Sequence, residues 1–340
     1  MNLAGAGRVA GRWAARLALL LVAAWGGLFL WFLPQVAQGW RITLLLPWLA
    51  LAGLALRRWR RGLRFATAPV LFGVAGIVLV CVFFSLQPQP RRDWADDVAH
   101  QPRARIAGNL LTLYEVRNFH WRSEQDYTVR WETRQYDLDT LATADLAVSY
   151  WMGPAIGHTL VSFGFDDGRQ LVFSLEIRKE RGEAFSALAG FFRNYEQVMV
   201  AADERDILRV RTNVRGEDLY LYRLNLSRAT LRSLLLGYLQ DAQRLRAQPA
   251  FYNTLTGNCT TVPFRLVRAI DPGLPLDYRL LLSGYLPNYA YDQHGLLPGH
   301  AFQALHDAGR VTARARAAGD AADFSTRIRI GMPTKAAESR

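Results

Sequence analysis

Three apolar segments dominate the first quarter of the chain, at residues 17–33, 42–56 and 65–86. They are bounded by arginine and proline and predict membrane-spanning helices, because about twenty apolar residues cross the hydrocarbon core of a bilayer. The third is long enough to span by itself, whereas the first two are near the lower limit and need their flanking residues. The first segment lacks a small-residue cleavage site and two more follow it, which argues against a signal peptide. Residues 1–86 are therefore predicted to form a three-helix transmembrane anchor.

The hydrophobic pattern changes after residue 86. Residues 87–105 are polar and contain three prolines, which predicts a linker. Short β-like and longer amphipathic segments then predict one α+β domain over 106–332, followed by a flexible tail over 333–340. The predicted strands are 110–116, 127–136, 144–150, 207–212 and 218–224, with a further candidate at 324–330. The predicted helices are 187–198, 226–247 and 261–270.

A β-hairpin is the clearest local prediction. Residues 159–165 and 171–177 alternate apolar and polar side chains around Asp166-Asp167-Gly168. A three-residue loop, with Gly168 in the left-handed conformation, aligns the two apolar faces, whereas a two-residue turn sets them on opposite sides. In this register His158 lies opposite Glu176. A further slip by two residues puts Arg178 opposite His158, and the pattern leaves that alternative open.

The net charge of +12 is unevenly distributed along the chain. Residues 1–86 hold nine arginines and no acidic residue, so 32 basic and 29 acidic side chains remain for the rest. Arginines cluster before the first apolar segment and between the second and third, which places both regions in the cytoplasm by the positive-inside rule. An odd number of spans then puts the following domain outside. The near balance of charge in that domain removes the main support for a nucleic-acid partner.

Cys259 is the first candidate for chemistry, because it is the only cysteine beyond the apolar segments and lies just before a predicted helix. A helix dipole favours the thiolate, which is the nucleophilic form of cysteine. Cys81 lies within the third apolar segment, so no disulfide is expected. The alternative is that Cys259 is a small buried hydrophobic residue. No metal-ligand spacing and no glycine-rich phosphate loop occurs, so neither a metal nor another cofactor is expected.

A thiol nucleophile needs a base within hydrogen-bond reach, and usually a third group that orients the base. His158 and Glu176, opposite each other in the predicted hairpin, supply these groups. The order of histidine before cysteine is the reverse of that in papain, and a circular permutation of a papain-like core produces it.

Four separate motifs carry a family resemblance: GHTLVSF at 157–163, SLEIRKERGE at 174–183, FYNTLTGNCTT at 251–261, and LLSGY with YAYD at 281–285 and 289–292. They closely resemble the Lnb-type N-terminal periplasmic domain family of bacterial membrane proteins, from about residue 137 to 331. The resemblance implies a circularly permuted papain-like, or NlpC/P60-like, domain of a multi-pass protein of the inner membrane, with its catalytic domain in the periplasm.

The same resemblance implies a function and a set of site residues. The name-giving branch moves a fatty acyl chain within a lipoprotein, from the glyceryl group to the amino group of the lipidated cysteine. The expected substrate is thus a membrane lipid or a lipoprotein. Cys259 corresponds to the nucleophile, His158 to the base and Glu176 to its orienting group, where related enzymes use His, Asn or Gln. Asn258 and Thr260 flank the nucleophile, and backbone N–H groups of Cys259 and Thr260 are expected to bind the oxyanion. Further candidate substrate contacts are Arg178, Arg181, Tyr285 and Tyr291.

Two other functions remain open at this point. The same three residues could cleave an amide in cell-wall peptide, which predicts an open polar groove, whereas a lipid substrate predicts an apolar channel beside Cys259. Alternatively, the domain is a non-catalytic membrane-bound scaffold. That hypothesis predicts that Cys259 shares no hydrogen-bond network with His158.

Overall fold

The computed structural model describes residues 3–34, 36–61, 67–89 and 91–334. Residues 65 and 66 of the third predicted span, and 335–340 of the predicted tail, lie outside them. The chain divides into two compact units. One contains Met1–Gln89, Phe185–Tyr195 and Phe251–Thr254, and the other contains Pro90–Ala184, Glu196–Ala250 and Leu255–Arg340. We call them the helical unit and the sheet unit.

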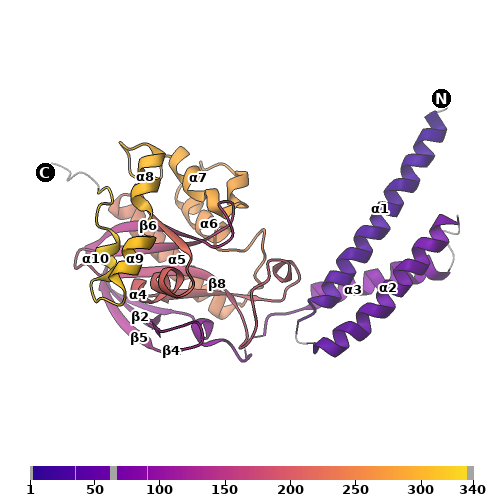
Figure 1. The fold of residues 1–340 in the computed structure, drawn as a ribbon, viewed down its shortest axis with the longest axis horizontal. Helices are drawn as coiled ribbons and strands as arrows, with labels where there is room; N and C mark the ends of the chain where they lie inside the picture. Colours follow the sequence, from indigo (N-terminus) through magenta and orange to yellow (C-terminus); the bar gives the residue numbers. More distant parts are fainter. Residues whose placement is uncertain (1–2, 35, 62–66, 90, 335–340) are drawn as a thin grey trace. The chain divides into compact units, whose positions relative to one another are not determined.

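The helical unit is built from α1 (Leu3–Trp31), α2 (Gln38–Arg60) and α3 (Thr67–Ser85), all labelled in Figure 1. Each of the three is long and apolar enough to cross a membrane. Trp48 of α2 is buried, its indole N–H donates to the carbonyl of Ala23 at 2.9 Å, and its ring lies 4.6 Å from that of Phe72. Gly26 is required beside Trp48, because a Cβ atom there would collide with the indole. A tryptophan therefore holds the three helices together.

The sheet unit is a mixed α+β structure around one large sheet, as the sequence predicts. The strand order is β1-β2-β9-β8-β7-β6-β10. β5 lies outside this order and pairs with β2. The strands of this sheet are β1 (Arg103–Ala107), β2 (Leu110–Arg117), β5 (Trp131–Asp137), β6 (Leu141–Tyr150), β7 (Gly157–Phe165), β8 (Gln170–Arg178), β9 (Glu196–Ala202) and β10 (Asp218–Arg223). A separate small ribbon contains β3 (His120–Trp121) and β4 (Tyr127–Thr128).

Helices cover both faces of the sheet (Figure 1). On one face α5 (Arg228–Ala247) and α6 (Thr261–Ile270) pack over Val161, Phe163 and Phe173. On the other, α4 (Glu204–Arg209), α9 (Thr312–Ala318) and α10 (Phe324–Ile328) pack over Leu160, Val172 and Val198. The remaining helices are α7 (Leu286–Asp292) and α8 (Phe302–Gly309), and short 3-10 turns include η1 (Asp96–Val98), η3 (Ala189–Phe191) and η6 (Ser283–Tyr285).

The predicted hairpin is confirmed in detail. β7 and β8 pair antiparallel with Leu160 opposite Ser174 and Gly164 opposite Gln170. The same register sets His158 opposite Glu176, so the alternative with Arg178 is wrong. Gly168 has a φ of 83°, and its N–H donates to the carbonyl of Phe165 at 2.9 Å. The positive φ of a bulge-type loop explains why glycine stands at this position.

Three secondary-structure predictions are wrong, and the prediction of a linker needs a correction. Residues 187–198 were expected to be helical, but they form the η3 turn and the first half of β9. The predicted strand 207–212 is α4 followed by a π-helix, η4 (Val210–Val214), and the candidate strand 324–330 is α10. The segment 87–105, predicted as a linker, contains η1 and the start of β1, and both Trp94 and Val98 in it are buried.

Candidate active site

Cys259 lies at the entrance of α6, two residues before the first helical residue, and is 8% exposed. Asn258 shapes this entrance: its side-chain oxygen accepts hydrogen bonds from the N–H groups of Thr260 and Thr261, at 2.9 and 2.8 Å. Capping of this kind satisfies helix N–H groups that have no partner within the helix. The open N-terminal end of the helix also favours negative charge nearby. The sulfur of Cys259 is therefore placed where a thiolate is stabilised.

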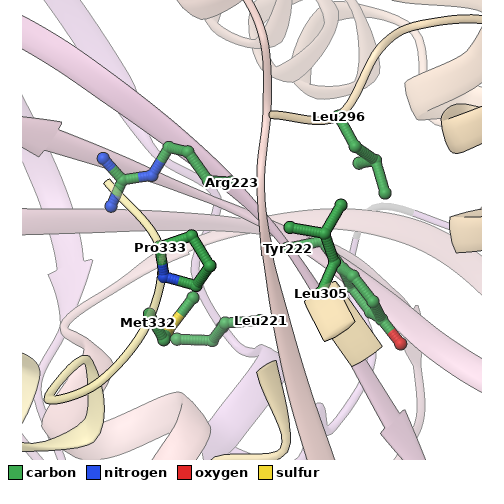
Figure 2. Close-up of a pocket in the computed structure, with 7 residues that line it drawn as sticks. All are labelled: Leu221, Tyr222, Arg223, Leu296, Leu305, Met332 and Pro333. Atoms are coloured by element: carbon green, nitrogen blue, oxygen red, sulfur yellow. The ribbon is translucent and has the colours of Figure 1, made fainter. Parts of the chain in front are cut away.

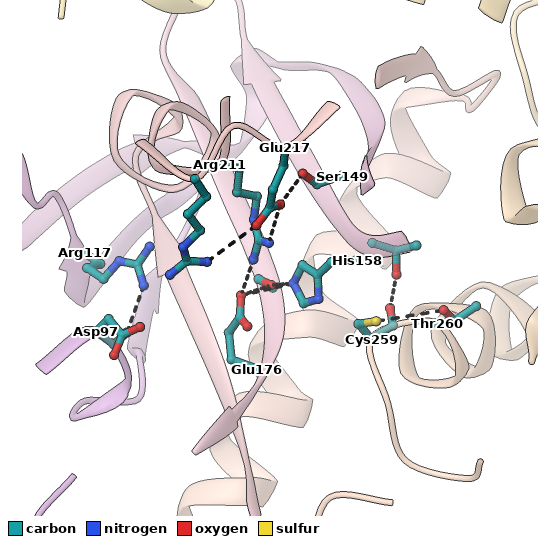
Figure 3. A network of polar contacts seen from close by, with 12 residues as sticks. Asp97, Arg117, Ser149, His158, Glu176, Arg211, Glu217, Cys259 and Thr260 are labelled. Atoms are coloured by element: carbon teal, nitrogen blue, oxygen red, sulfur yellow. Dashed lines mark hydrogen bonds and ion pairs between the residues drawn. The ribbon is translucent and has the colours of Figure 1, made fainter. Parts of the chain in front are cut away.

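His158, at the start of β7, is buried beside the cysteine. Its Nε2 lies 2.7 Å from the hydroxyl of Ser174 and 3.1 Å from a carboxylate oxygen of Glu176. In Figure 3 the imidazole stands between Glu176 and the sulfur of Cys259. Because Nε2 is occupied by Ser174 and Glu176, Nδ1 is the ring nitrogen left for the thiol.

The pKa values of the three groups are shifted in opposite directions. Burial raises the pKa of Cys259, but the charge and hydrogen bond of His158 and contacts with Thr159 outweigh it and lower the pKa to about 7. Burial lowers the pKa of His158, but the Glu176 carboxylate outweighs it and raises the pKa to about 9. Despite its burial, Glu176 has a pKa well below the usual value because of His158 and Arg211. Between pH 7 and 9 the pair is therefore a thiolate and an imidazolium.

The backbone around Cys259 is held from the neighbouring strand. The hydroxyl of Thr159 donates to the carbonyl of Cys259, so β7 carries both His158 and a residue that supports Cys259. The prediction for the oxyanion donors needs one correction. The N–H of Thr260 donates to Asn258 and is not free. Among the described residues, the N–H of Cys259 has no protein acceptor, and it is the donor that remains for an oxyanion.

Arg211 and Ser174 are members of the site that the sequence did not indicate. Ser174 accepts from His158 and donates to Glu176 at 2.8 Å, so it bridges the two. Arg211 donates to Glu176 at 3.0 Å and to Glu217 at 3.2 Å. Glu217 in turn accepts from Ser149, which lies opposite His158 in the β6–β7 pairing. These contacts form a chain of polar groups that runs from His158 through Glu176 and Arg211 to Glu217 (Figure 3).

The π-helix explains how Arg211 reaches two carboxylates at once. A π-turn adds a residue to a helix and changes the direction of its side chains, and such turns are frequent at functional sites. Arg211 lies in η4 and is only 5% exposed. Its charge compensates Glu176 and Glu217, which a buried position otherwise disfavours.

Replacing Arg211 with methionine is expected to raise the pKa of His158 further above about 9, by on the order of one unit. The guanidinium disfavours the imidazolium, and its removal leaves His158 as the only positive charge beside Glu176. The measurement is a pH titration of the full-length protein labelled with 13C-histidine, followed by NMR. Two variants serve as controls. Arg211→Lys keeps the charge, and Arg105→Met removes an arginine from the exposed strand β1. In both, His158 should titrate as it does in the wild type. An unchanged or lower pKa in Arg211→Met contradicts the assignment.

The four remaining candidate substrate contacts, Arg178, Arg181, Tyr285 and Tyr291, lie in two places in the sheet unit. Arg178 donates to the carbonyls of Val98 and Ala99, and Arg181 pairs with Asp93 and Asp96, so both bind the segment around η1. Both arginines therefore hold that segment, and their predicted contact with a substrate stays a prediction. Tyr285 and Tyr291 line one groove of about 350 Å³, together with Tyr278, Arg279, Asn288, Asp292 and Phe302. This groove adjoins η6, where Ser283 holds both the N–H and the carbonyl of Gly157.

A second cavity, shown in Figure 2, lies between β10, Leu305 of α8 and the segment after α10. Its volume of about 10 Å³ has room for roughly one water molecule. It is therefore too small for a substrate. In the part of the chain that the structure describes, no group of three or more His, Cys, Asp or Glu side chains could hold a metal ion.

The fold and the site define an α+β domain with a buried thiol–imidazole–carboxylate set, in a chain that also carries three apolar helices. Residues 127–284 match the model of the Lnb N-terminal periplasmic domain family. No curated protein and no solved structure matches the chain significantly. The family match and the three helices together indicate a membrane-associated protein with a periplasmic domain.

Proposed function

We propose that the Cys259 centre is a thiol acyltransferase that takes fatty acyl groups from lipid esters outside the inner membrane, through a thioester on Cys259. The observation that carries this proposal is the interaction of Cys259 with His158, which lowers the pKa of the thiol to about 7. A thiolate available at neutral pH is the form that attacks a carbonyl carbon. The resemblance to permuted NlpC/P60-like enzymes supports the assignment of the three groups.

The first half-reaction forms the thioester. The Cys259 thiolate attacks the ester carbonyl, and the N–H of Cys259 stabilises the oxyanion. The carbon–oxygen bond of the ester then breaks, and the leaving alkoxide takes the proton from Nδ1 of His158. Glu176 and Ser174 hold the ring while its charge changes.

The second half-reaction releases the acyl group. A primary amine, as in the N-terminus of a lipoprotein, attacks the thioester carbonyl while neutral His158 takes a proton from it. The carbon–sulfur bond breaks, the amide product leaves, and the thiolate–imidazolium pair is restored. Water in place of the amine gives hydrolysis by the same steps.

The sequence positions of the site also suit a lipid substrate. The segment Phe251–Thr254 belongs to the helical unit, and its last residue lies five positions before Cys259 in the chain. In a chain with three helices suited to a bilayer, an ester can react without leaving the lipid–water interface.

The test is intact-mass analysis of the full-length protein after incubation with a diacyl phospholipid or a diacylglyceryl lipopeptide. Wild type should gain the mass of one acyl chain, removable by neutral hydroxylamine as expected of a thioester, and Cys259→Ala should gain none. Cys81→Ala is the matched control, because it removes the other cysteine and should retain the adduct. Equal adducts in wild type and Cys259→Ala would remove Cys259 from the reaction.

The groove beside η6 favours a second candidate function, cleavage of an amide in cell-wall peptide. Its lining of tyrosine, asparagine and a pair of charged side chains, beside Phe302, offers hydrogen-bonding groups that a peptide can use and an acyl chain cannot. In the same mass experiment, a cell-wall tetrapeptide replaces the lipid. Peptide fragments that depend on Cys259, without any lipid adduct, would favour this function.

A further inference from the structure

An apolar loop of the helical unit, residues 185–192, has an unusual composition for a water-exposed segment. No charged residue occurs between Glu183 and Arg193, and the loop contains three phenylalanines and a leucine. Phe185 and Leu188 are 51% and 54% exposed. Single exposed apolar residues are common on protein surfaces, but a continuous apolar segment usually marks an interaction site.

The apolar loop packs on the C-terminal ends of α1 and α3. The ring of Phe192 is stacked on Phe32 at 5.8 Å and lies 6.5 Å from Trp25, which in turn contacts Phe83 of α3 at 5.7 Å. The same ends of the two helices therefore lie together, as expected when α1 and α3 cross a bilayer in the same direction.

Arg193 fixes the end of the loop to α3. Its guanidinium lies 4.6 Å from the ring centre of Phe83 and donates to the carbonyl of Leu86 at 3.1 Å. The last carbonyls of a helix lack partners within the helix and carry partial negative charge, so an arginine satisfies them. An arginine over an aromatic ring at a helix end is also suited to the border between hydrocarbon and water.

We propose that the apolar loop inserts into the lipid interface, with Phe185 and Leu188 among the acyl chains nearest the headgroups. Lipid is the occupant that the surroundings favour, because the loop packs on the ends of helices whose length and composition suit a bilayer. Phe84, next to this contact, is 64% exposed and is the last aromatic residue of α3. Aromatic residues gather at membrane interfaces, and an uncharged loop loses little on entering the headgroup layer.

The loop is also bound to the segment of chain that leads to Cys259. Thr254 donates to the carbonyl of Ala187 at 2.9 Å, and Tyr252 donates through its N–H to Tyr195 at 2.9 Å. Gly190 lies so close to Thr254 that a Cβ atom on it would collide with the threonine hydroxyl. The lipid-inserted loop therefore braces residues 251–254, just before the nucleophile.

The test labels single cysteines with the fluorophore NBD in the full-length protein, with Cys81→Ser and Cys259→Ala removing the native thiols. Leu188→Cys is the test position and Ile106→Cys is the matched control, since Ile106 is an exposed apolar residue of β1 in the sheet unit. The protein is placed in nanodiscs with and without brominated phosphatidylcholine. NBD at 188 should emit at shorter wavelength and be quenched severalfold more by brominated lipid than NBD at 106.

Phe185→Cys gives an independent second position, should one labelled variant fail to assemble. Equal lipid quenching at 188 and 106 would overturn the proposal. So would a label at 185 or 188 shielded from both brominated lipid and aqueous iodide, because that result indicates a protein partner. The readout is insertion and not activity, so its outcome is independent of the proposed acyl transfer.

Discussion

Alkylation of Cys259 by iodoacetamide at pH 6 is expected to be about 100-fold slower in His158→Ala than in the wild type. The thiol has a pKa of about 7 beside His158, against an ordinary value of 9.0. Without the imidazolium only the effect of burial and the weaker contacts remain, so the pKa should return to at least that ordinary value. Two pKa units change the thiolate fraction by about 100-fold wherever the pH lies below both values.

The rate should therefore rise as the pH passes about 7 in the wild type, and only near pH 9 or above in His158→Ala. The measurement is the time course of adduct mass in a Cys81→Ser background, from pH 5 to 10. His120→Ala is the matched control, because His120 also lies 2.6 Å from a carboxylate, that of Asp320, but on the surface. Similar rates in His158→Ala and the control would show that the imidazole does not activate the thiol.

Replacing Asp145 with alanine is expected to lower the free energy of unfolding by about 3–5 kcal/mol, the effect typical of removing one partner from a buried ion pair. Asp145 is completely buried in β6 and accepts from Arg223 at 2.5 Å and from Arg329 at 2.9 Å. Arg329 also donates to Glu204, which is completely buried as well. The substitution leaves two arginines in the interior with less compensation.

The measurement is urea-induced unfolding of the full-length protein in detergent micelles, followed by tryptophan fluorescence. Asp126→Ala is the control, since its pair with Arg122 lies at the surface, where water screens the charges, and should contribute little to stability. Burial raises the pKa of Asp145, but the two arginines outweigh it and lower the pKa overall. Its contribution should thus persist at neutral pH and disappear only as the pH falls through the lowered value. A loss no larger than that of Asp126→Ala would contradict the assigned role.

The sequence was sufficient to predict the part of the site that local rules determine. Alternation along β7 and β8 and the glycine at 168 define one hairpin register, and that register brings His158 to Glu176. Ser227 as a capping residue likewise marks the start of α5. Cys259 was found because it is the only cysteine in a polar helix entrance.

Long-range packing decided the parts that were predicted wrongly. The apolar residues of 207–212 suggest a strand. In the structure, however, Ile207 and Leu208 pack in the core on the face of the sheet that α9 and α10 cover. Val210 joins a separate cluster with Phe119. A helix signal was present, because Asp203 caps α4 and two acidic residues occupy its first turn. Nothing local marks the π-helix after it, so the position of Arg211 against Glu176 could not be foreseen.

His158 and Cys259 come from segments a hundred residues apart, a strand and a helix entrance that meet only in the assembled domain. During synthesis and export the cysteine is consequently an ordinary thiol, largely protonated and slow to react with oxidants or stray electrophiles. The low pKa of this thiol arises only when the tertiary structure is complete, so the sulfur of a partly folded chain is protected from damage.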